Sequence, residues 1–362
     1  MTKNAGTQSL PEYLIRDILR RLEVKSLIRF QCVSKQWKTL INAPSFIAEH
    51  LRRQSPCLLF QGEAHRNLQL RLLDRDLQAR DMQVQPSVFG LESPKIVGSS
   101  NGLLCLRIEK ELHLSTILLW NPAIRELRIT PRLLGRRMDF LNVGFGFSPI
   151  INDYKVVVIR RPDYYNRPPH VDVYSLTSGS WKSVDHNILE GIRLKGSRVI
   201  ANGVMFWHVG NDDADMILSF DIAMEVLALI PFPVVANRDL CIKLAVYGNK
   251  LAMLVKDYSW RNSKPECIDL WVMDEGDVAS SYGHEKRSWT KKCNTFPCKV
   301  HPRMIWNNEI VCQVWEHEKP RIALFNVTTS EFHITGMHDS KCFDYVESLV
   351  RVGGNKLYAT FT

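Results

Sequence analysis

A short unit that recurs about every 50 residues constrains the fold of this chain more than any other feature. The unit is an Asn or Asp turn residue followed by an apolar, strand-like run. It begins at Asn101, Asp153, Asn202, Asn249, Asn308 and Asn355. Successive units are 52, 49, 47, 59 and 47 residues apart. A regular period of this length indicates one supersecondary unit that buries its apolar faces against copies of itself.

A second apolar unit alternates with the first. It is centred on Trp120, Tyr174, Phe220, Trp271 and Phe325, at intervals of 54, 46, 51 and 54 residues. Two strand-like units with a shared period near 50 residues are typical of four-stranded, kelch-type propeller blades. Residues 57–362 would then form about six blades, and the last unit predicts a strand over Lys356–Phe361.

The ring also has to close. We expect the early runs Leu58–Phe60 and Leu70–Leu73 to pair with C-terminal strands, since closure leaves no long free edge. A β-sandwich or an irregular all-β domain is the alternative to the propeller.

The first 50 residues have a different sequence pattern, which is typical of α-helices. Leu10-Pro11-Glu12 indicates a helix start, because proline suits the first turn and an acid suits the positive end of the helix dipole. Apolar residues then follow at helical spacing, at Leu14, Ile15, Ile18, Leu19 and Leu22, with two further sets around Leu27 and Trp37 and a last one after Pro44. Four short helices bury too little surface to be stable alone, so part of this apolar set should face a partner or the downstream domain.

Most of the positive charge lies in the same segment. The chain has a formal net charge of +9, and residues 1–56 hold ten Lys or Arg against four Asp or Glu. This imbalance favours an acidic partner. Because the charge is concentrated on a small helical module, an acidic protein surface fits better than nucleic acid.

The rest of the composition indicates an intracellular globular protein. Hydrophobic residues make up 45% and charged residues 23%, no uncharged apolar run of membrane-spanning length occurs, and residues 1–9 lack the apolar core of a signal peptide. The nine cysteines include no Cys-x-x-Cys pair, and we interpret them as buried free thiols. We therefore expect a cytoplasmic and/or nuclear location without membrane contact.

No motif in the sequence predicts a catalytic or metal-binding site. Gly98-x-Ser100-x-Gly102 matches a nucleophile elbow in form, but a strand follows it where that motif needs a helix. Cys293, Cys298 and His301 lack the fourth ligand of a tetrahedral zinc site at workable spacing. The sequence therefore predicts no catalytic residue, metal site or cofactor.

The N-terminal residues resemble a known family. The pattern Leu10-Pro11-Glu12 followed by Arg29-Phe30-Gln31-Cys32-Val33-Ser34-Lys35-Gln36-Trp37 is similar to the F-box. The resemblance implies binding to the adaptor Skp1 and, through it, to a cullin. It implies that the following residues form the module and its Skp1 face: Leu10, Pro11, Ile15, Ile18, Leu19, Leu27, Val33 and Trp37. The pattern leaves open which of them touch Skp1 and which hold the helices together.

The segment from about 95 to 185 resembles the F-box-associated domain of plant F-box proteins. The matching motifs are Gly98–Leu106, Leu119-Trp120-Asn121-Pro122, Gly144–Phe147, Asp153–Val157 and Val171–Leu176. The resemblance implies an α+β chain of this order: a disordered N-terminus (1–8), an F-box (9–52), a connecting segment with the first strands (53–94), and a kelch-like β-propeller domain (95–362).

Two functional hypotheses follow. In the first, the chain is the non-catalytic substrate-recognition subunit of a Skp1–cullin–F-box (SCF) ubiquitin ligase and holds an unidentified target protein on propeller loops. Aromatic and arginine side chains are typical of interface hot spots. The loop residues we select as candidates for target binding are Tyr164, Tyr165, Arg167, Trp260 and Arg261. In the second, it is a propeller-type carbohydrate-binding protein or enzyme with a helical appendage, which would need convergent polar groups on the propeller axis.

Overall fold

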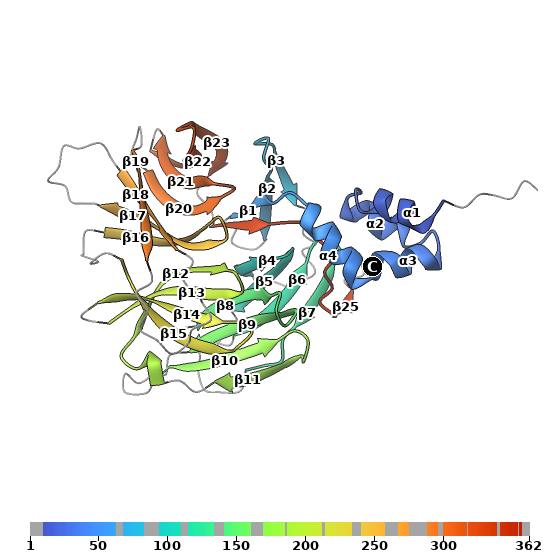
Figure 1. Ribbon diagram of the computed structural model, residues 1–362, viewed down its shortest axis with the longest axis horizontal. Coiled ribbons are helices and arrows are strands. Elements are labelled where there is room, and N and C mark those ends of the chain that lie inside the picture. Colours follow the sequence, from blue (N-terminus) through green and yellow to red (C-terminus); the bar gives the residue numbers. More distant parts are fainter. Residues whose placement is uncertain are drawn as a thin grey trace, which may run out of the picture.

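The computed structural model describes residues 10–62, 68–82, 94–109, 115–133, 141–160, 169–184, 187–211, 214–233, 240–257, 267–274, 288–295, 300–316, 318–338, 341–353 and 355–356. The predicted disordered residues 1–8 lie outside these ranges. The described chain forms four short helices followed by a ring of six β-sheets (Figure 1). Both the helical start and the six-bladed propeller expected from the sequence are confirmed.

The helices form a module that we call the helical module (residues 10–53). Its helices are α1 (Glu12–Leu19), α2 (Val24–Phe30), α3 (Lys35–Asn42) and α4 (Pro44–Arg53). Pro11 occupies the N-cap position of α1 without a side-chain capping bond, the Ser34 hydroxyl accepts a hydrogen bond from the Trp37 amide at the start of α3, and Pro44 is the first residue of α4. Leu19, Val24, Leu27, Leu40, Ile41 and Phe46 form its core.

Each blade is an antiparallel four-stranded sheet, and one blade carries a fifth strand. Blade 1 contains β24 (Lys341–Tyr345), β1 (Cys57–Gly62), β2 (Gln69–Leu73) and β3 (Ala79–Met82), and blade 2 contains β4 (Lys95–Ser100), β5 (Leu103–Glu109), β6 (Ser115–Asn121), β7 (Glu126–Ile129) and β25 (Asn355–Lys356). Blade 3 contains β8 (Leu141–Ser148), β9 (Asp153–Arg160), β10 (His170–Ser175) and β11 (Ser180–Val184), followed by a short 3-10 helix (Asn187–Leu189), and blade 4 contains β12 (Arg193–Ala201), β13 (Val204–Gly210), β14 (Asp215–Asp221) and β15 (Val226–Pro231). Blade 5 contains β16 (Leu240–Tyr247), β17 (Lys250–Asp257), β18 (Cys267–Met273) and β19 (Trp289–Thr295), and blade 6 contains β20 (Val300–Trp306), β21 (Glu309–Glu316), β22 (Lys319–Asn326) and β23 (Phe332–His338).

The recurring Asn marks the tight turn between the first and second strands of a blade. Asn101, Asn202, Asn249 and Asn308 all have φ between 49 and 64°. Asn tolerates this left-handed conformation better than most residues, and two-residue hairpins require it. The repeat in the sequence is thus a repeat of hairpin geometry.

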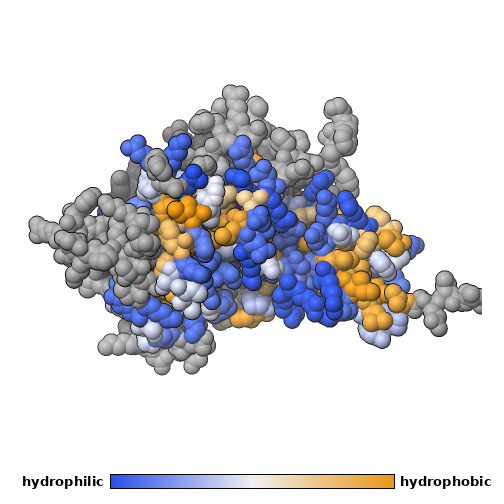
Figure 2. Space-filling model, turned by 90° about the horizontal axis from the view of Figure 1, so that it is seen from above, coloured by the Kyte–Doolittle hydropathy of each residue, from blue (hydrophilic) through white to orange (hydrophobic). Residues whose placement is uncertain are grey.

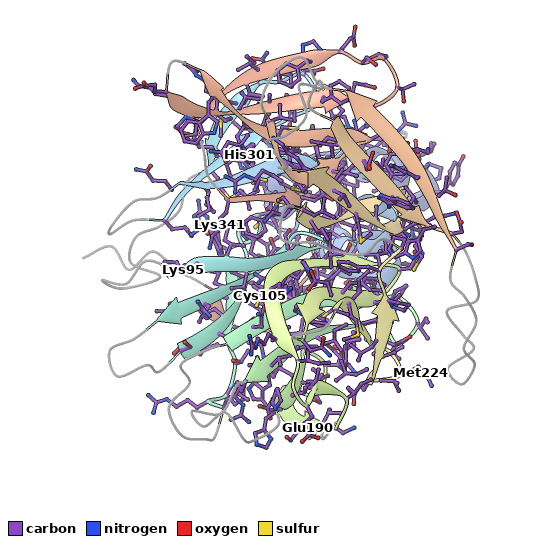
Figure 3. All side chains as sticks on the ribbon, turned by 90° about the vertical axis from the view of Figure 1, so that its left-hand side faces the viewer. Lys95, Cys105, Glu190, Met224, His301 and Lys341 are labelled. Carbon is purple, nitrogen blue, oxygen red and sulfur yellow. The ribbon has the colours of Figure 1, made fainter. Side chains whose placement is uncertain are left out.

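Apolar clusters fill the gaps between neighbouring blades. One cluster joins Val143 and Phe145 of blade 3 to Leu103 and Leu119 of blade 2, and the other blade boundaries are filled in the same way. Because each sheet buries both faces against its neighbours, the domain grows by adding blades rather than by enlarging one core. Figure 3 shows the ring from the end away from the helices, with Glu190 and Met224 at its periphery.

The ring closes by pairing the two ends of the domain, as expected for Leu58–Phe60; Leu70–Leu73 belongs to the same blade but pairs with β1 and β3 rather than with a C-terminal strand. In blade 1 the C-terminal strand β24 is innermost and lies antiparallel to β1, with Leu59 opposite Phe343. The last repeat unit differs from its prediction. Asn355 and Lys356 do not begin the second strand of a blade; they pair with β7 at the outer edge of blade 2. The sixth second-strand position is already occupied by β1, so the chain end adds to an existing edge, and the remainder of the predicted strand lies outside the described residues.

Residues 346–353, which we call the C-terminal strap, join the helical module to the propeller. The Asn121 side-chain amide donates to the carbonyl oxygens of Ser348 (3.0 Å) and Val350 (2.7 Å). On the other side of the strap, Leu349 packs into the core of the helical module beside Ala123 and Ile124 of the β6–β7 turn. The helices therefore adjoin the end of the propeller that carries the Asn turns. No helix within the described ranges is long and apolar enough to cross a membrane.

Candidate functional site

Helix α1 carries apolar side chains on two adjoining faces, one packed into the module and one exposed. Leu19 is 1% exposed and points into the helical module, whereas Ile18, the preceding residue, is 51% exposed. Leu14, four residues before Ile18, shares its face and is 38% exposed. Tyr13 and Leu10 extend this surface toward the N-terminus, at 70% and 55% exposure. Figure 2 shows hydrophobic side chains gathered on the surface of this end of the molecule.

The predicted F-box residues separate into two groups. Leu19 and Leu27 are buried, and Ile15 and Trp37 are half-buried against the same core; Trp37 packs edge-on to Phe30 with ring centroids 5.5 Å apart. The exposed group consists of Leu10, Pro11, Ile18 and Val33, the last in the turn between α2 and α3. We call Leu10, Tyr13, Leu14, Ile18 and Val33 the exposed apolar face. Tyr13 and Leu14 were missed as candidates, although the spacing of four residues between Leu14 and Ile18 could have placed Leu14 there.

Ion pairs neutralise part of the positive charge of the helical module. Arg16 contacts Glu49 (2.8 Å), and Asp17 pairs with Arg21 (2.6 Å) and with Arg20. Hydrogen bonds from Arg20 and Arg16 hold the pKa values of Asp17 and Glu49, respectively, below their usual range. Other basic side chains of α2 and α3 are exposed: Lys25, Arg29, Lys35 and Lys38. The exposed apolar face is thus part of a basic module, which suits an acidic partner with an apolar groove.

The five target-binding candidates of the propeller, Tyr164, Tyr165, Arg167, Trp260 and Arg261, lie outside the described residues. The strands on either side of them are described. β9 ends at Arg160 and β10 begins at His170, while β17 ends at Asp257 and β18 begins at Cys267. Each of these connections joins a second strand to a third, and it therefore starts and ends away from the Asn turns and the helical module.

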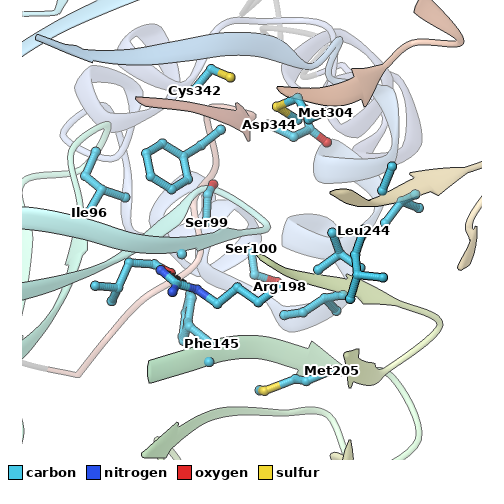
Figure 4. A pocket seen from close by; sticks show the side chains of 18 of the residues that line it. Ile96, Ser99, Ser100, Phe145, Arg198, Met205, Leu244, Met304, Cys342 and Asp344 are labelled. Atoms are coloured by element: carbon cyan, nitrogen blue, oxygen red, sulfur yellow. Dashed lines mark hydrogen bonds between the residues drawn. The ribbon is translucent and has the colours of Figure 1, made fainter. Parts of the chain in front are cut away.

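A cavity of about 720 Å³ runs along the propeller axis. Its wall is formed by the innermost strand of every blade, so all six blades contribute to it. Pro56 and Val346 border the end near the helical module. In Figure 4, Arg198 and Phe145 lie on one side of the cavity, and Met304 and Asp344 lie on the other. Burial raises the pKa of Asp344.

One imidazole–carboxylate pair lies in blade 4. The His208 Nε2 atom is 3.1 Å from an Asp215 oxygen, and Lys195 contacts the other oxygen of Asp215. Burial lowers the pKa of His208, and its bond to Asp215 opposes that effect. The pair has the form of an oriented base, but among the described residues no Ser or Cys side chain bonds to this imidazole. No cluster of three or more potential metal ligands occurs in the described part of the chain.

The geometry defines a protein of two parts, a four-helix module with an exposed apolar face and a closed six-bladed propeller fixed to it by the strap. Residues 8–48 match the F-box domain, and residues 50–352 match the F-box associated beta propeller domain. The chain therefore belongs to the plant F-box proteins that carry an F-box-associated propeller.

Individual relatives agree with this assignment. The chain is 28% identical to the F-box protein CPR1 of Arabidopsis thaliana over 321 residues, covering 78% of this chain and 72% of the relative. It is 24% identical to the F-box/kelch-repeat protein At3g23880 of the same plant over 361 residues, covering 92% and 94%. The putative F-box protein At1g47730 is 27% identical over 311 residues, covering 81% and 73%.

Proposed function

We propose that this chain is the substrate-recognition subunit of an SCF ubiquitin ligase. The exposed apolar face of the helical module would bind a Skp1-like adaptor, which joins the chain to a cullin. The propeller would hold a target protein for ubiquitination. The observation that carries the proposal is that Leu10, Tyr13, Leu14, Ile18 and Val33 are exposed on a module whose other large apolar side chains pack, fully or in part, into its core, within a chain that belongs to the F-box proteins.

The proposed mechanism needs no bond chemistry from this chain. A bound target is held near the ubiquitin-conjugating enzyme, which raises the effective concentration of its lysines. The fixed contact between module and propeller supports this role because it holds the two binding surfaces at a defined separation. Such a subunit would act in the cytoplasm or nucleus.

Substitution of Ile18 tests the adaptor contact. Ile18→Asp places a charge in the exposed apolar face without entering the core, since Ile18 is 51% exposed. We expect the variant to remain folded and to lose capture of a purified Skp1-like adaptor by at least tenfold in affinity. Leu19→Asp would be a poor test, because Leu19 is buried and its replacement would unfold the module.

Ile334→Asp is the matched control. Ile334 lies on β23 of blade 6 and is 48% exposed, so the change in chemistry and exposure is nearly the same at a distant site. We expect this variant to bind the adaptor like the unsubstituted chain. Equal capture by both variants, with thermal unfolding unchanged, would refute the proposal.

A further inference from the structure

The axial cavity contains a partly buried cation that has no acidic partner among the described residues. Arg198 reaches from β12 of blade 4 to the Val97 carbonyl oxygen of blade 2, and donates to it from Nε (3.1 Å) and Nη2 (2.7 Å). The pairing of β4 with β5 is shifted at this point, between Ile96 and Gly98, which leaves the Val97 carbonyl outside the regular ladder. The guanidinium is thus fixed in position by one neutral acceptor.

The groups around Arg198 do not compensate its charge. Within the described residues, no salt bridge joins this guanidinium to a carboxylate, and the groups whose charges act on its pKa are the Cys105 thiol and Arg107. Burial and the charge of Arg107 both lower the pKa of Arg198. A guanidinium has five N–H donors, and Val97 uses two of them. Partly enclosing a charge without a partner of opposite sign is unfavourable, and the two bonds to Val97 leave three N–H donors of this guanidinium for a ligand in the cavity that Arg198 lines.

Two hydroxyl donors lie on β4, the innermost strand of blade 2. Ser99 and Ser100 both line the cavity (Figure 4). The Ser99 hydroxyl is enclosed and has no hydrogen-bond partner among the described residues. Because buried polar atoms are rarely left unbonded, this hydroxyl is a further donor that the fold itself does not use.

The overall lining is basic with apolar patches. Among the described residues, its charged side chains are four cations and one acid: Arg198, Lys243, Arg303, Lys341 and Asp344. Phe145, Met205, Leu244 and Met304 supply apolar surface. A volume of about 720 Å³ lies in the range of small-molecule sites, which combine an apolar wall with a few fixed polar groups.

We propose that the axial cavity binds a small organic anion, with its carboxylate or phosphate on Arg198 and the Ser99 and Ser100 hydroxyls and its apolar body against Phe145 and Met304. This goes beyond the proposed function, because binding would not require the adaptor or the target protein. Access would be from the end away from the helical module, where Lys341 and Ile96 border the cavity.

The test uses the full-length chain and three probes of similar size: phenyl phosphate, benzoate and neutral benzyl alcohol. We expect at least one anion to bind with a stoichiometry of one in titration calorimetry, and to raise the unfolding temperature with increasing concentration. We expect benzyl alcohol to bind at least tenfold more weakly. Whether phenyl phosphate or benzoate binds more tightly distinguishes a phosphate site from a carboxylate site.

Two variants connect binding to the site. Arg198→Gln should weaken binding of the preferred anion at least tenfold, but it also alters the bond to Val97. A Ser99→Ala, Ser100→Ala double variant removes two hydroxyls for which the described chain shows no hydrogen bond. It should therefore fold normally and still lose affinity by about tenfold. Ser148→Ala is the control, since the Ser148 hydroxyl is also buried without a partner among the described residues and does not line the cavity.

Two results would overturn the proposal. One is that neither anion binds more tightly than benzyl alcohol. The other is that the double serine variant, shown to be folded, binds the anion as tightly as Ser148→Ala does.

Discussion

At the scale of single residues, the imidazole of His50 should make the helical module sensitive to acid. His50 is fully buried on α4, and its Nε2 lies 2.8 Å from the Leu22 carbonyl oxygen. Nε2 therefore donates, and Nδ1 has no partner in the described part of the chain. Burial lowers the pKa of His50 from its ordinary value of 6.5, because a protonated ring would carry an unsatisfied buried N–H.

The direction of the pH effect follows from this pKa. Since the unfolded chain takes up the proton at a higher pH than the folded chain, His50 stabilises the fold fully above about pH 6.5, and that contribution is lost as the pH falls toward the folded pKa. The loss is up to about 1.4 kcal/mol per pH unit for one group. We expect acidification from about pH 7.5 to 5.5 to lower the unfolding free energy of the unsubstituted chain more than that of His50→Gln. The exposed His333→Gln should behave like the unsubstituted chain, and equal pH dependence of all three would contradict the argument.

The contrast between Ile18 and Leu19 shows what single-residue patterns can predict. Both are apolar neighbours in one helix, and the sequence predicts correctly that the helix forms. The sequence cannot tell which of the two is buried, because Leu14 and Ile18 form one apolar row on α1 and Ile15 and Leu19 form another beside it. The assignment depends on where α3, α4 and Leu349 pack, which is a tertiary property.

At the scale of secondary-structure elements, the turn between β4 and β5 should tolerate substitution less than the equivalent turn of blade 4. Gly102 and Gly203 follow the recurring Asn and have φ of 82° and 75°. A Cβ at Gly102 would lie 2.5 Å from the Val346 carbonyl oxygen of the strap, whereas at Gly203 the nearest atom would be 3.6 Å away. Alanine is strained by the positive φ at both positions, but it overlaps the strap only at Gly102.

We therefore expect Gly102→Ala to reduce the unfolding free energy by about 1–3 kcal/mol more than Gly203→Ala, the usual range for overpacking. Chemical denaturation of both variants measures the difference directly, and Gly203→Ala serves as the control for the strain of the turn itself. A larger loss for Gly203→Ala would show that the strap shifts to admit the added carbon.

The repeat made these elements predictable to a large extent. The second strands of blades 2 to 6 begin where the first recurring unit predicts them, because hairpin turns impose residue requirements that can be seen in the sequence. The second recurring unit lies within the third strand of each of these blades, near its end. Asn355 resembled the other units and was placed wrongly, since Asn355 and Lys356 pair as an added strand at the edge of β7. Arg198 was missed altogether, because nothing in its local sequence indicates that it reaches across the axis to Val97.

At the scale of the whole molecule, the C-terminal strap makes the helical module and the ring one unit. Glu126 is buried on β7 and accepts hydrogen bonds from the Arg351 guanidinium (3.0 Å) and the Val352 amide (3.2 Å). Together with Asn121 it fixes the strap on blade 2 and presents Leu349 to the helices. The part of the chain that closes the ring through β24 thus leads directly into the part that holds the module.

Leu349 should therefore contribute to the stability of helices α1 to α4, although it lies far from them in the sequence. It is 4% exposed, and Leu349→Ala would remove its contacts with the core of the helical module, a change that typically costs about 2–5 kcal/mol. We expect faster amide hydrogen exchange throughout α1 to α4 and unchanged exchange in blades 3 to 5, as measured by mass spectrometry. Leu77→Ala, at a residue 39% exposed in the turn between β2 and β3, should leave both regions unchanged. Unaltered protection of the helices in Leu349→Ala would mean that the module is stable independently of the propeller, and that the spacing between its two proposed binding surfaces is set by the covalent connection near Pro56 instead.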